Sequence, residues 1–208
     1  MKSEWDSLIN HQEHSVDYKG LKIIVWDGVF TPDQNLTYSS TQTLEYLEDI
    51  DIQGKDILDM GCGTGIIGIA CLIKGANRVT FTDVNQKSIE NTIFNLKENN
   101  LFGNRVDVIT SDLFKEVSGQ FDIIFANLPI SNELWVPEIN ENTEGLLVKF
   151  LRDIPHFVKE KGRVIINWGS FADLNEVTAT LKKFGYPYTL VTQSKLGYDW
   201  YIINIQFN

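Results

Sequence analysis

The chain has little of what marks a secreted, membrane-bound or metal-dependent protein. Its 208 residues include two cysteines and three scattered histidines, which form neither a disulfide framework nor a cluster of metal ligands. The longest apolar run, Ile66–Ile73, is far too short to cross a bilayer. The first ten residues do not resemble a signal peptide. We therefore expect a cytoplasmic protein with no metal site and no contact with a membrane.

Basic residues are also scarce. There are 18 Lys and Arg against 28 Asp and Glu, which gives a formal net charge of −10. Proteins that bind nucleic acid without a partner protein usually carry a stripe of basic residues on their surface. Here only Lys159, Lys161 and Arg163 gather, and we expect them at the solvated end of a helix, where the helix dipole favours cations. The charge argues against bulk RNA or DNA as a partner and leaves room for a small RNA footprint.

The most informative stretch is Ile57–Gly65, which predicts a buried strand, a glycine-rich loop and the start of an apolar helix. Three glycines stand at alternate positions of the loop: Gly61, Gly63 and Gly65. Glycine lets a ligand approach the backbone and allows a positive φ. Asp59 closes the strand, and Asp83 follows 22 residues after Gly61, at the end of the next predicted strand. A loop of this kind with a carboxylate for ribose hydroxyls is typical of a nucleotide-type cofactor site.

Two other interpretations of the loop must be weighed. Gly63–Gly68 also fits G-x-G-x-x-G, the dinucleotide fingerprint, in which a pyrophosphate sits on the helix N-terminus. A carboxylate at Asp59 would repel that pyrophosphate, whereas it suits a ligand that carries an ammonium group. The loop could also be a purely structural strand-to-helix turn, but the pair of Asp59 and Asp83 favours a ligand site.

These residues resemble motif I of the class I S-adenosylmethionine-dependent methyltransferases. Ser111–Phe114 is similar to the family segment whose acidic side chain faces the adenine amino group, and Phe121–Ile130 resembles the fourth strand running into a variant of the Asn-Pro-Pro-aromatic motif. The resemblance covers roughly residues 28–207. It implies S-adenosylmethionine as cofactor, with contacts from Asp59, Gly61, Cys62, Gly63, Gly65, Asp83, Val84, Asp112, Leu113 and Asn127.

The resemblance further implies a catalytic segment Asn127-Leu128-Pro129. The Asn127 side-chain oxygen and the Leu128 carbonyl would each accept one N–H of a planar acceptor nitrogen, and Pro129 would stiffen the loop. No strong general base is required. The fourth position is usually aromatic and stacks on the acceptor, but here it is Ile130. Either Ile130 packs on a smaller amide, or a nearby ring replaces the aromatic, or the acceptor is not planar; the candidate rings are Tyr38, Trp135 and Trp168.

Strand-like and helix-like segments alternate from about residue 56. We expect an α/β, doubly wound, mostly parallel seven-stranded sheet with a C-terminal antiparallel hairpin, the Rossmann-like methyltransferase fold. Residues 1–50 would form an N-terminal extension with a strand and a short helix, packed on a cofactor-binding domain of residues 51–208. Expected helices include 142–159 and 171–184, the second with a capping box at Ser170–Asp173 and a Gly185 C-cap, and the closing strands are 187–193 and 199–207.

Two methyltransferase groups look most similar within this class. One modifies guanine in ribosomal RNA, and Gly28–Phe30 and 111–127 resemble it; the other modifies a glutamine of release factors, and Leu151–Gly169 and Leu196–Asp199 resemble it. We expect an N-methyltransferase that acts on a protein side-chain amide or amine, because of the acidic surface and Ile130. The alternatives are an RNA base N-methyltransferase and a non-catalytic cofactor-binding subunit that supports a partner.

Overall fold

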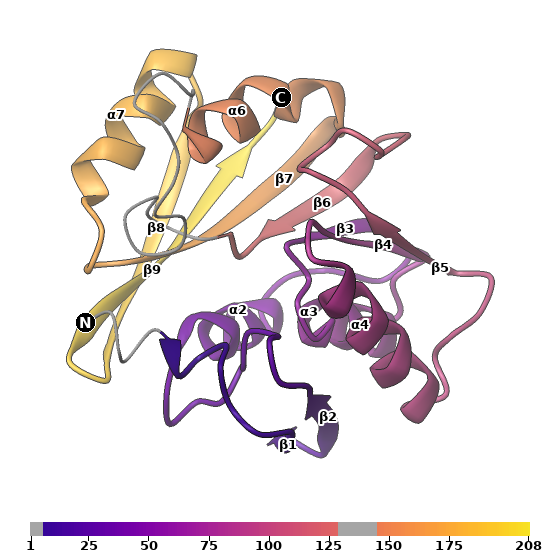
Figure 1. Cartoon of the computed structure of the whole chain (residues 1–208). Helices are drawn as coiled ribbons and strands as arrows, with labels where there is room; N and C mark the ends of the chain where they lie inside the picture. Colours follow the sequence, from indigo (N-terminus) through magenta and orange to yellow (C-terminus); the bar gives the residue numbers. More distant parts are fainter. Residues whose placement is uncertain (1–5, 129–144) are drawn as a thin grey trace.

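The computed structural model, which describes residues 6–128 and 145–208, is built around a seven-stranded sheet with helices on both faces (Figure 1). The strands are β3 (Asp56–Met60), β4 (Arg78–Asp83), β5 (Val106–Thr110), β6 (Phe121–Ala126), β7 (Val158–Gly169), β8 (Tyr188–Lys195) and β9 (Tyr198–Gln206). Their order is β5-β4-β3-β6-β7-β9-β8. The first five strands in that order are parallel, and β9 runs antiparallel to both β7 and β8. The predicted fold class is confirmed.

Each face of the sheet carries its own apolar core because alternate residues of a strand point to opposite faces. In β6, Ile123 and Phe125 join one core, whereas Ile124 and Ala126 join the other. The first core lies under α2 (Ser39–Leu47), α3 (Ile66–Ile73) and α4 (Gln86–Glu98). The second lies under α6 (Leu146–Asp153), the 3₁₀ turn Ile154–His156 and α7 (Leu174–Phe184). None of the described helices has the length and apolarity needed to span a membrane.

A small hairpin, β1 (His14–Tyr18) and β2 (Leu21–Val25), precedes the sheet and is held by asparagine side chains of α4. Ile24 N–H donates to Asn95 Oδ1 over 2.9 Å, and Ile24 O accepts from Asn91 Nδ2 and Asn95 Nδ2. Asn95 Nδ2 also donates to Thr64 O, in the glycine loop. The hairpin and the loop are therefore linked through one buried side chain. The division of the chain at residue 50 stays a prediction.

The predicted helix 142–159 was too long. The helix α6 ends at Asp153, and Val158 already pairs with Phe121 in the sheet. The basic cluster at 159–163 consequently lies in β7 rather than at a helix end. Lys159 Nζ lies 2.6 Å from Asp56 Oδ2 and 2.8 Å from Asp122 Oδ2, so this cation joins the beginnings of three neighbouring strands.

The ends of α7 were predicted with mixed success. Gly185 caps its C-terminus in the left-handed conformation, as expected. The capping box at Ser170 was wrong: the N-cap is Asp173, whose carboxylate accepts from Asn175 N–H over 2.8 Å. Ser170 Oγ instead accepts from Asp199 N–H, because β9 lies beside the end of β7.

Gly68 offers a test of the packing between α3 and the sheet. A Cβ at this position would lie 2.2 Å from Phe81 Cε1, so we expect Gly68→Ala to lower the free energy of unfolding by about 1–3 kcal/mol. Urea denaturation measures this. Gly103→Ala is the control, since its Cβ would meet no atom within 4 Å. If Gly68→Ala and Gly103→Ala had the same free energy of unfolding, the close packing of Gly68 against Phe81 would be contradicted.

Candidate active site

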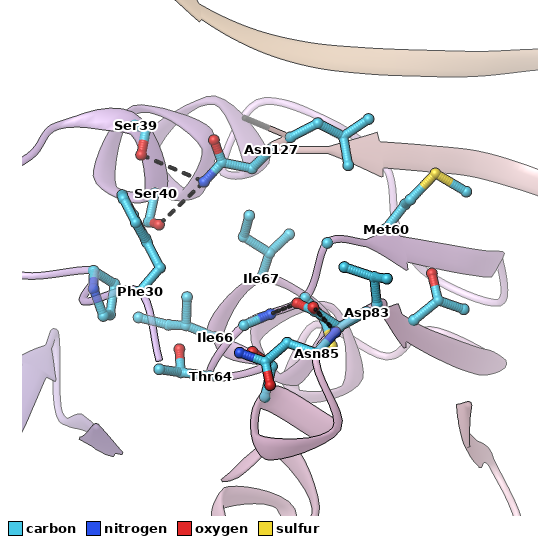
Figure 2. A pocket seen from close by; sticks show the side chains of 18 of the residues that line it. Phe30, Ser39, Ser40, Met60, Thr64, Ile66, Ile67, Asp83, Asn85 and Asn127 are labelled. Atoms are coloured by element: carbon cyan, nitrogen blue, oxygen red, sulfur yellow. Dashed lines mark hydrogen bonds between the residues drawn. The ribbon is translucent and has the colours of Figure 1, made fainter. Parts of the chain in front are cut away.

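A cavity of about 480 Å³ opens at the carboxyl ends of the parallel strands (Figure 2). The loops that follow β3, β4, β5 and β6 line it, together with the segment 28–40. Ligands of doubly wound sheets bind at this edge. Predicted residues lining the cavity are Gly61, Cys62, Gly63, Asp83, Val84, Asp112, Leu113, Asn127 and Leu128. Asp59 and Gly65 are not among the residues that line it.

The glycine loop is tied to the neighbouring strand by its own backbone. Gly61 N–H and Cys62 N–H both donate to Thr82 O, over 2.8 and 2.9 Å. Gly61 has φ 70° and its Cβ would lie 3.0 Å from Leu128 Cδ2, whereas a Cβ on Gly63 would meet open space. Burial raises the pKa of the Cys62 thiol well above its usual value. The loop therefore presents its backbone to the cavity while it packs closely against the segment after β6.

Asp83, at the end of β4, has a carboxylate held in a fixed orientation. Its Oδ2 accepts from Gly63 N–H over 3.0 Å and its Oδ1 from Asn85 N–H over 2.8 Å (Figure 2). Burial raises the pKa of this carboxyl, and the backbone donors oppose that rise. The side chain is well placed to accept hydrogen bonds from the hydroxyls of a ribose.

Asp59 differs from the expectation that it would face the ammonium group of a ligand. It is 1% exposed, and its Oδ2 accepts from Gly68 N–H in the first turn of α3 over 2.9 Å. Because successive side chains of a strand point to opposite faces of the sheet, Asp59 points toward α3, whereas its neighbour Met60 lines the cavity. Burial raises the pKa of Asp59 to about 7. The Asp59 carboxylate could therefore attract a cation bound in the cavity only across the glycine loop, without contacting it.

The segment after β5 makes a tight turn at the edge of the cavity. Leu113 has φ 52°, a left-handed conformation that non-glycine residues seldom adopt. Ser111 Oγ donates to Leu113 O over 2.8 Å and holds the turn. Asp112 and Leu113 both line the cavity, so the predicted adenine-binding segment lies beside Asp83.

Asn127 follows β6 and lies between the glycine loop and α2. Its Nδ2 donates to Ser39 Oγ and Ser40 Oγ, each over 3.4 Å (Figure 2). Its Oδ1 receives no hydrogen bond from any residue that the structure describes. Pro129, Ile130 and Trp135 lie outside the described residues.

Sequence reasoning missed several residues that line the cavity. Ser39 and Ser40 start α2, and the polar run 39–43 is fully buried, which is unusual for an amphipathic helix. Among the described residues, the aromatic side chains on the cavity wall are Phe30, Phe171 and Trp200. Two proposed substitutes for an aromatic at position 130 were wrong. Tyr38 is buried and donates to Glu45 Oε2 and Gln193 Oε1, and Trp168 belongs to the core under α6 and α7.

The cavity fits a nucleoside that carries a positive charge. Among the residues that the structure describes, the charged side chains on its lining, Asp83 and Asp112, are both acidic. The buried Thr82 hydroxyl lines the cavity and has no hydrogen-bond partner among the described residues, so it can serve a polar ligand. Within residues 6–128 and 145–208 there is no group of three or more His, Cys, Asp or Glu that could hold a metal ion.

The chain matches the family model of the methyltransferase small domain over residues 20–199. It belongs to this family. It is therefore an S-adenosylmethionine-dependent methyltransferase, which confirms the predicted enzyme class and cofactor.

Relatives of this methyltransferase differ in their acceptors. A candidate protein N5-glutamine methyltransferase of Methanocaldococcus jannaschii is 29% identical, over 88% of this chain and 94% of the relative. The ribosomal protein L11 methyltransferase of Thermosipho melanesiensis is 36% identical over 55% of this chain, which spans only 38% of that protein. The 16S rRNA N2 G1207 methyltransferase of T. thermophilus, solved with AdoMet and guanosine, shares the fold with TM-score 0.70 and 18% identity over 95% of this chain and 50% of its own.

The role assigned to Asp83 can be tested with adenosine, which has the ribose and lacks the methionine part. We expect Asp83→Ala to weaken adenosine binding by about 1.5–3 kcal/mol, because charge-assisted hydrogen bonds are lost. Isothermal titration calorimetry measures this, with Asp107→Ala as control, since Asp107 pairs with Arg78 at the opposite ends of the strands. Equal losses in Asp83→Ala and Asp59→Asn would contradict the assignment.

The buried Asp59 predicts a pH dependence of stability. A folded-state pKa of about 7 exceeds the unfolded value of about 3.9, so the folded protein binds more protons between them. Stability from this group is fully present below pH ~4 and is lost as the pH rises through ~7. Asp59→Asn keeps an acceptor for Gly68 N–H and should remove this loss. The unfolding free energies of the original protein and of Asp59→Asn would be measured by urea denaturation from pH 4 to 8. The original protein should lose stability relative to Asp59→Asn between about pH 4 and 7. Parallel stability curves for the two proteins would contradict the raised pKa of Asp59.

Proposed function

We propose that this methyltransferase transfers a methyl group to a side-chain amide or amine nitrogen of a protein substrate. The observation that carries the proposal is the orientation of Asn127. Its Nδ2 is engaged by Ser39 and Ser40, which leaves Oδ1 available at the carboxyl end of β6, next to the glycine loop. An oxygen in that position suits an acceptor N–H.

The proposed roles in binding follow the geometry of the cavity. Asp83 would accept from the ribose hydroxyls, and Asp112 and Leu113 would face the adenine. Gly61, Cys62 and Gly63 would offer backbone to the methionine part, with Val84 at the edge. Asp59 and Gly65 would support the loop from behind, because Gly65 packs on Thr92 and Asp59 binds the start of α3.

The methyl transfer requires little proton transfer by side chains of the protein. When bound, S-adenosylmethionine supplies a methyl group on a sulfonium, which a nucleophile attacks directly. An amide or conjugated amine nitrogen has a delocalised lone pair, so it must be held at near-attack distance and its charge stabilised. Asn127 Oδ1 and the Leu128 carbonyl would each accept one N–H of that nitrogen. The close packing of Gly61 on Leu128 would keep these acceptors next to the cofactor.

The preference for a protein acceptor rests on charge and on the relatives. A net charge of −10 disfavours contact with a polyanion. The relative that this chain spans almost completely is named for glutamine methylation of a protein. To test the preference, the enzyme would be incubated with methyl-labelled S-adenosylmethionine and separate protein and RNA fractions of a lysate. Label in protein supports the proposal, whereas label confined to RNA would show that the acceptor is RNA.

Asn127→Ala separates catalysis from binding. We expect the methylation rate to fall about a hundredfold or more, the scale of losing one preorganised polar group, while the affinity for S-adenosylmethionine changes little. Initial rates on the labelled fraction and calorimetry give the two quantities. The control is Asn104→Ala, in the turn before β5 and outside the cavity lining. A fully active Asn127→Ala enzyme would refute the assigned role.

A further inference from the structure

The cavity continues past Asn127 toward the C-terminal strands, where aromatic side chains line it. In the sheet order, β3, β4 and β5 lie on one side of β6, and β7 and β9 lie on the other. The acidic lining residues follow β4 and β5. Phe171, just after the end of β7, and Trp200, paired with Gly169 across β7 and β9, line the opposite half. We call this the acceptor half, because Asn127 separates it from the residues proposed for the cofactor.

Trp200 is fixed from several directions. It is 2% exposed, and its indole N–H donates to Lys195 O over 3.0 Å. Its own carbonyl accepts from Gln42 Nε2 of α2 over 2.9 Å. The same residue therefore joins the turn between β8 and β9 to the helix whose first residues hold Asn127.

The position of the Phe171 ring is also fixed by its neighbours. Its ring centroid lies 5.5 Å from that of Trp200 at 73° and 5.6 Å from that of Tyr198 at 87°, the edge-to-face geometry that aromatic pairs favour. The ring also occupies the space above Gly169, where a Cβ would lie 2.2 Å from Phe171 Cε1. Phe171 is thus half-buried, packs on Trp200 and Tyr198, and lines the cavity.

The acceptor half suits a flat, uncharged group. Its described lining consists of apolar and neutral polar side chains: Ser39, Ser40, Asn127, Leu128, Leu146, Phe171 and Trp200. Aromatic rings bind planar groups through their faces. A lysine ammonium would have to lose a proton before it could attack, and none of these side chains is a carboxylate or histidine that could take that proton.

We propose that Phe171, positioned by Gly169 and Trp200, is a specificity-determining residue that selects a planar carboxamide over a lysine ammonium. This rests on the proposed function and narrows it. The ring takes over the stacking role that position 130 of this chain, an isoleucine, does not supply. When S-adenosylmethionine is bound, the carbon–sulfur bond to its methyl group would break as the new N–C bond forms, the thioether S-adenosylhomocysteine would leave, and the amide nitrogen would lose a proton to solvent.

The first experiment identifies the methylated group. Protein labelled by the enzyme with methyl-labelled S-adenosylmethionine is hydrolysed in strong acid. An N-methyl carboxamide yields a carboxylic acid and volatile labelled methylamine, whereas N-methyl lysine survives as a non-volatile amino acid. We expect volatile label. Labelled methyl-lysine would overturn the carboxamide assignment and leave the proposed protein N-methyltransferase intact, and label in RNA alone would overturn the proposed function itself.

The second experiment tests the ring with two variants that disturb it differently. Phe171→Leu removes the aromatic face, and Gly169→Ala displaces the ring while leaving Phe171 in the sequence. For the labelled protein fraction we expect each to raise KM by about tenfold, the scale of a lost stacking contact, with kcat within about twofold. The affinity for S-adenosylmethionine, measured by calorimetry, should not change.

Matched controls are Phe102→Leu, whose ring is exposed beside α4, and Gly103→Ala, whose Cβ would meet open space. Neither should alter KM. A KM that is unchanged in both Phe171→Leu and Gly169→Ala, in protein that still binds the cofactor normally, would overturn the role of Phe171. A loss of cofactor affinity in both would also overturn it, since the ring would then belong to the cofactor half.

Discussion

The site depends on two backbone hydrogen bonds that tie the loop after β3 to the end of β4. Gly61 N–H and Cys62 N–H share the carbonyl of Thr82 as acceptor. With the loop pinned there, Gly63 N–H reaches the carboxylate of Asp83, the next residue along β4. The loop that would take the polar end of the cofactor and the acid that would take its ribose are thereby fixed relative to each other by main-chain geometry, which side-chain substitution disturbs least.

Two helices extend this arrangement to the rest of the molecule. The helix α4 supports the glycine loop from below, where Thr92 Oγ1 donates to Gly63 O and Asn95 donates to Thr64 O. The helix α2 brings Ser39 and Ser40 to the amide of Asn127, and Asn167 of β7 donates back to Ser39 O over 3.1 Å. Polar side chains that are buried in both helices are costly unless they are paired, and here several of their partners are parts of the site.

Local sequence patterns predicted the parts of the site whose geometry is local. The alternating strands and helices, the glycine loop and the acid at the end of β4 each follow from short-range spacing. The direction of Asp59 did not, because it depends on the face of β3 that α3 covers. The wall formed by Phe171 and Trp200 could not be predicted either: it requires the register of β7 against β9, two strands that are separated by all of α7 and β8. The end of α6 was missed because Pro155, which has no backbone N–H to continue the helical hydrogen bonds, lies in the 3₁₀ turn that follows α6, and Val158 then pairs with Phe121 of β6.

The 3.0 Å approach between a Cβ at residue 61 and Leu128 has a consequence for how such an enzyme can diverge. A side chain at position 61 would push on Leu128, so substitutions in the loop after β3 and in the segment that carries Asn127 constrain each other. At the end of β7, a Cβ at Gly169 would meet Phe171 instead of the loop after β3. New acceptors would then arise most readily by substitutions near the C-terminus, while the first half of the sheet stays as it is.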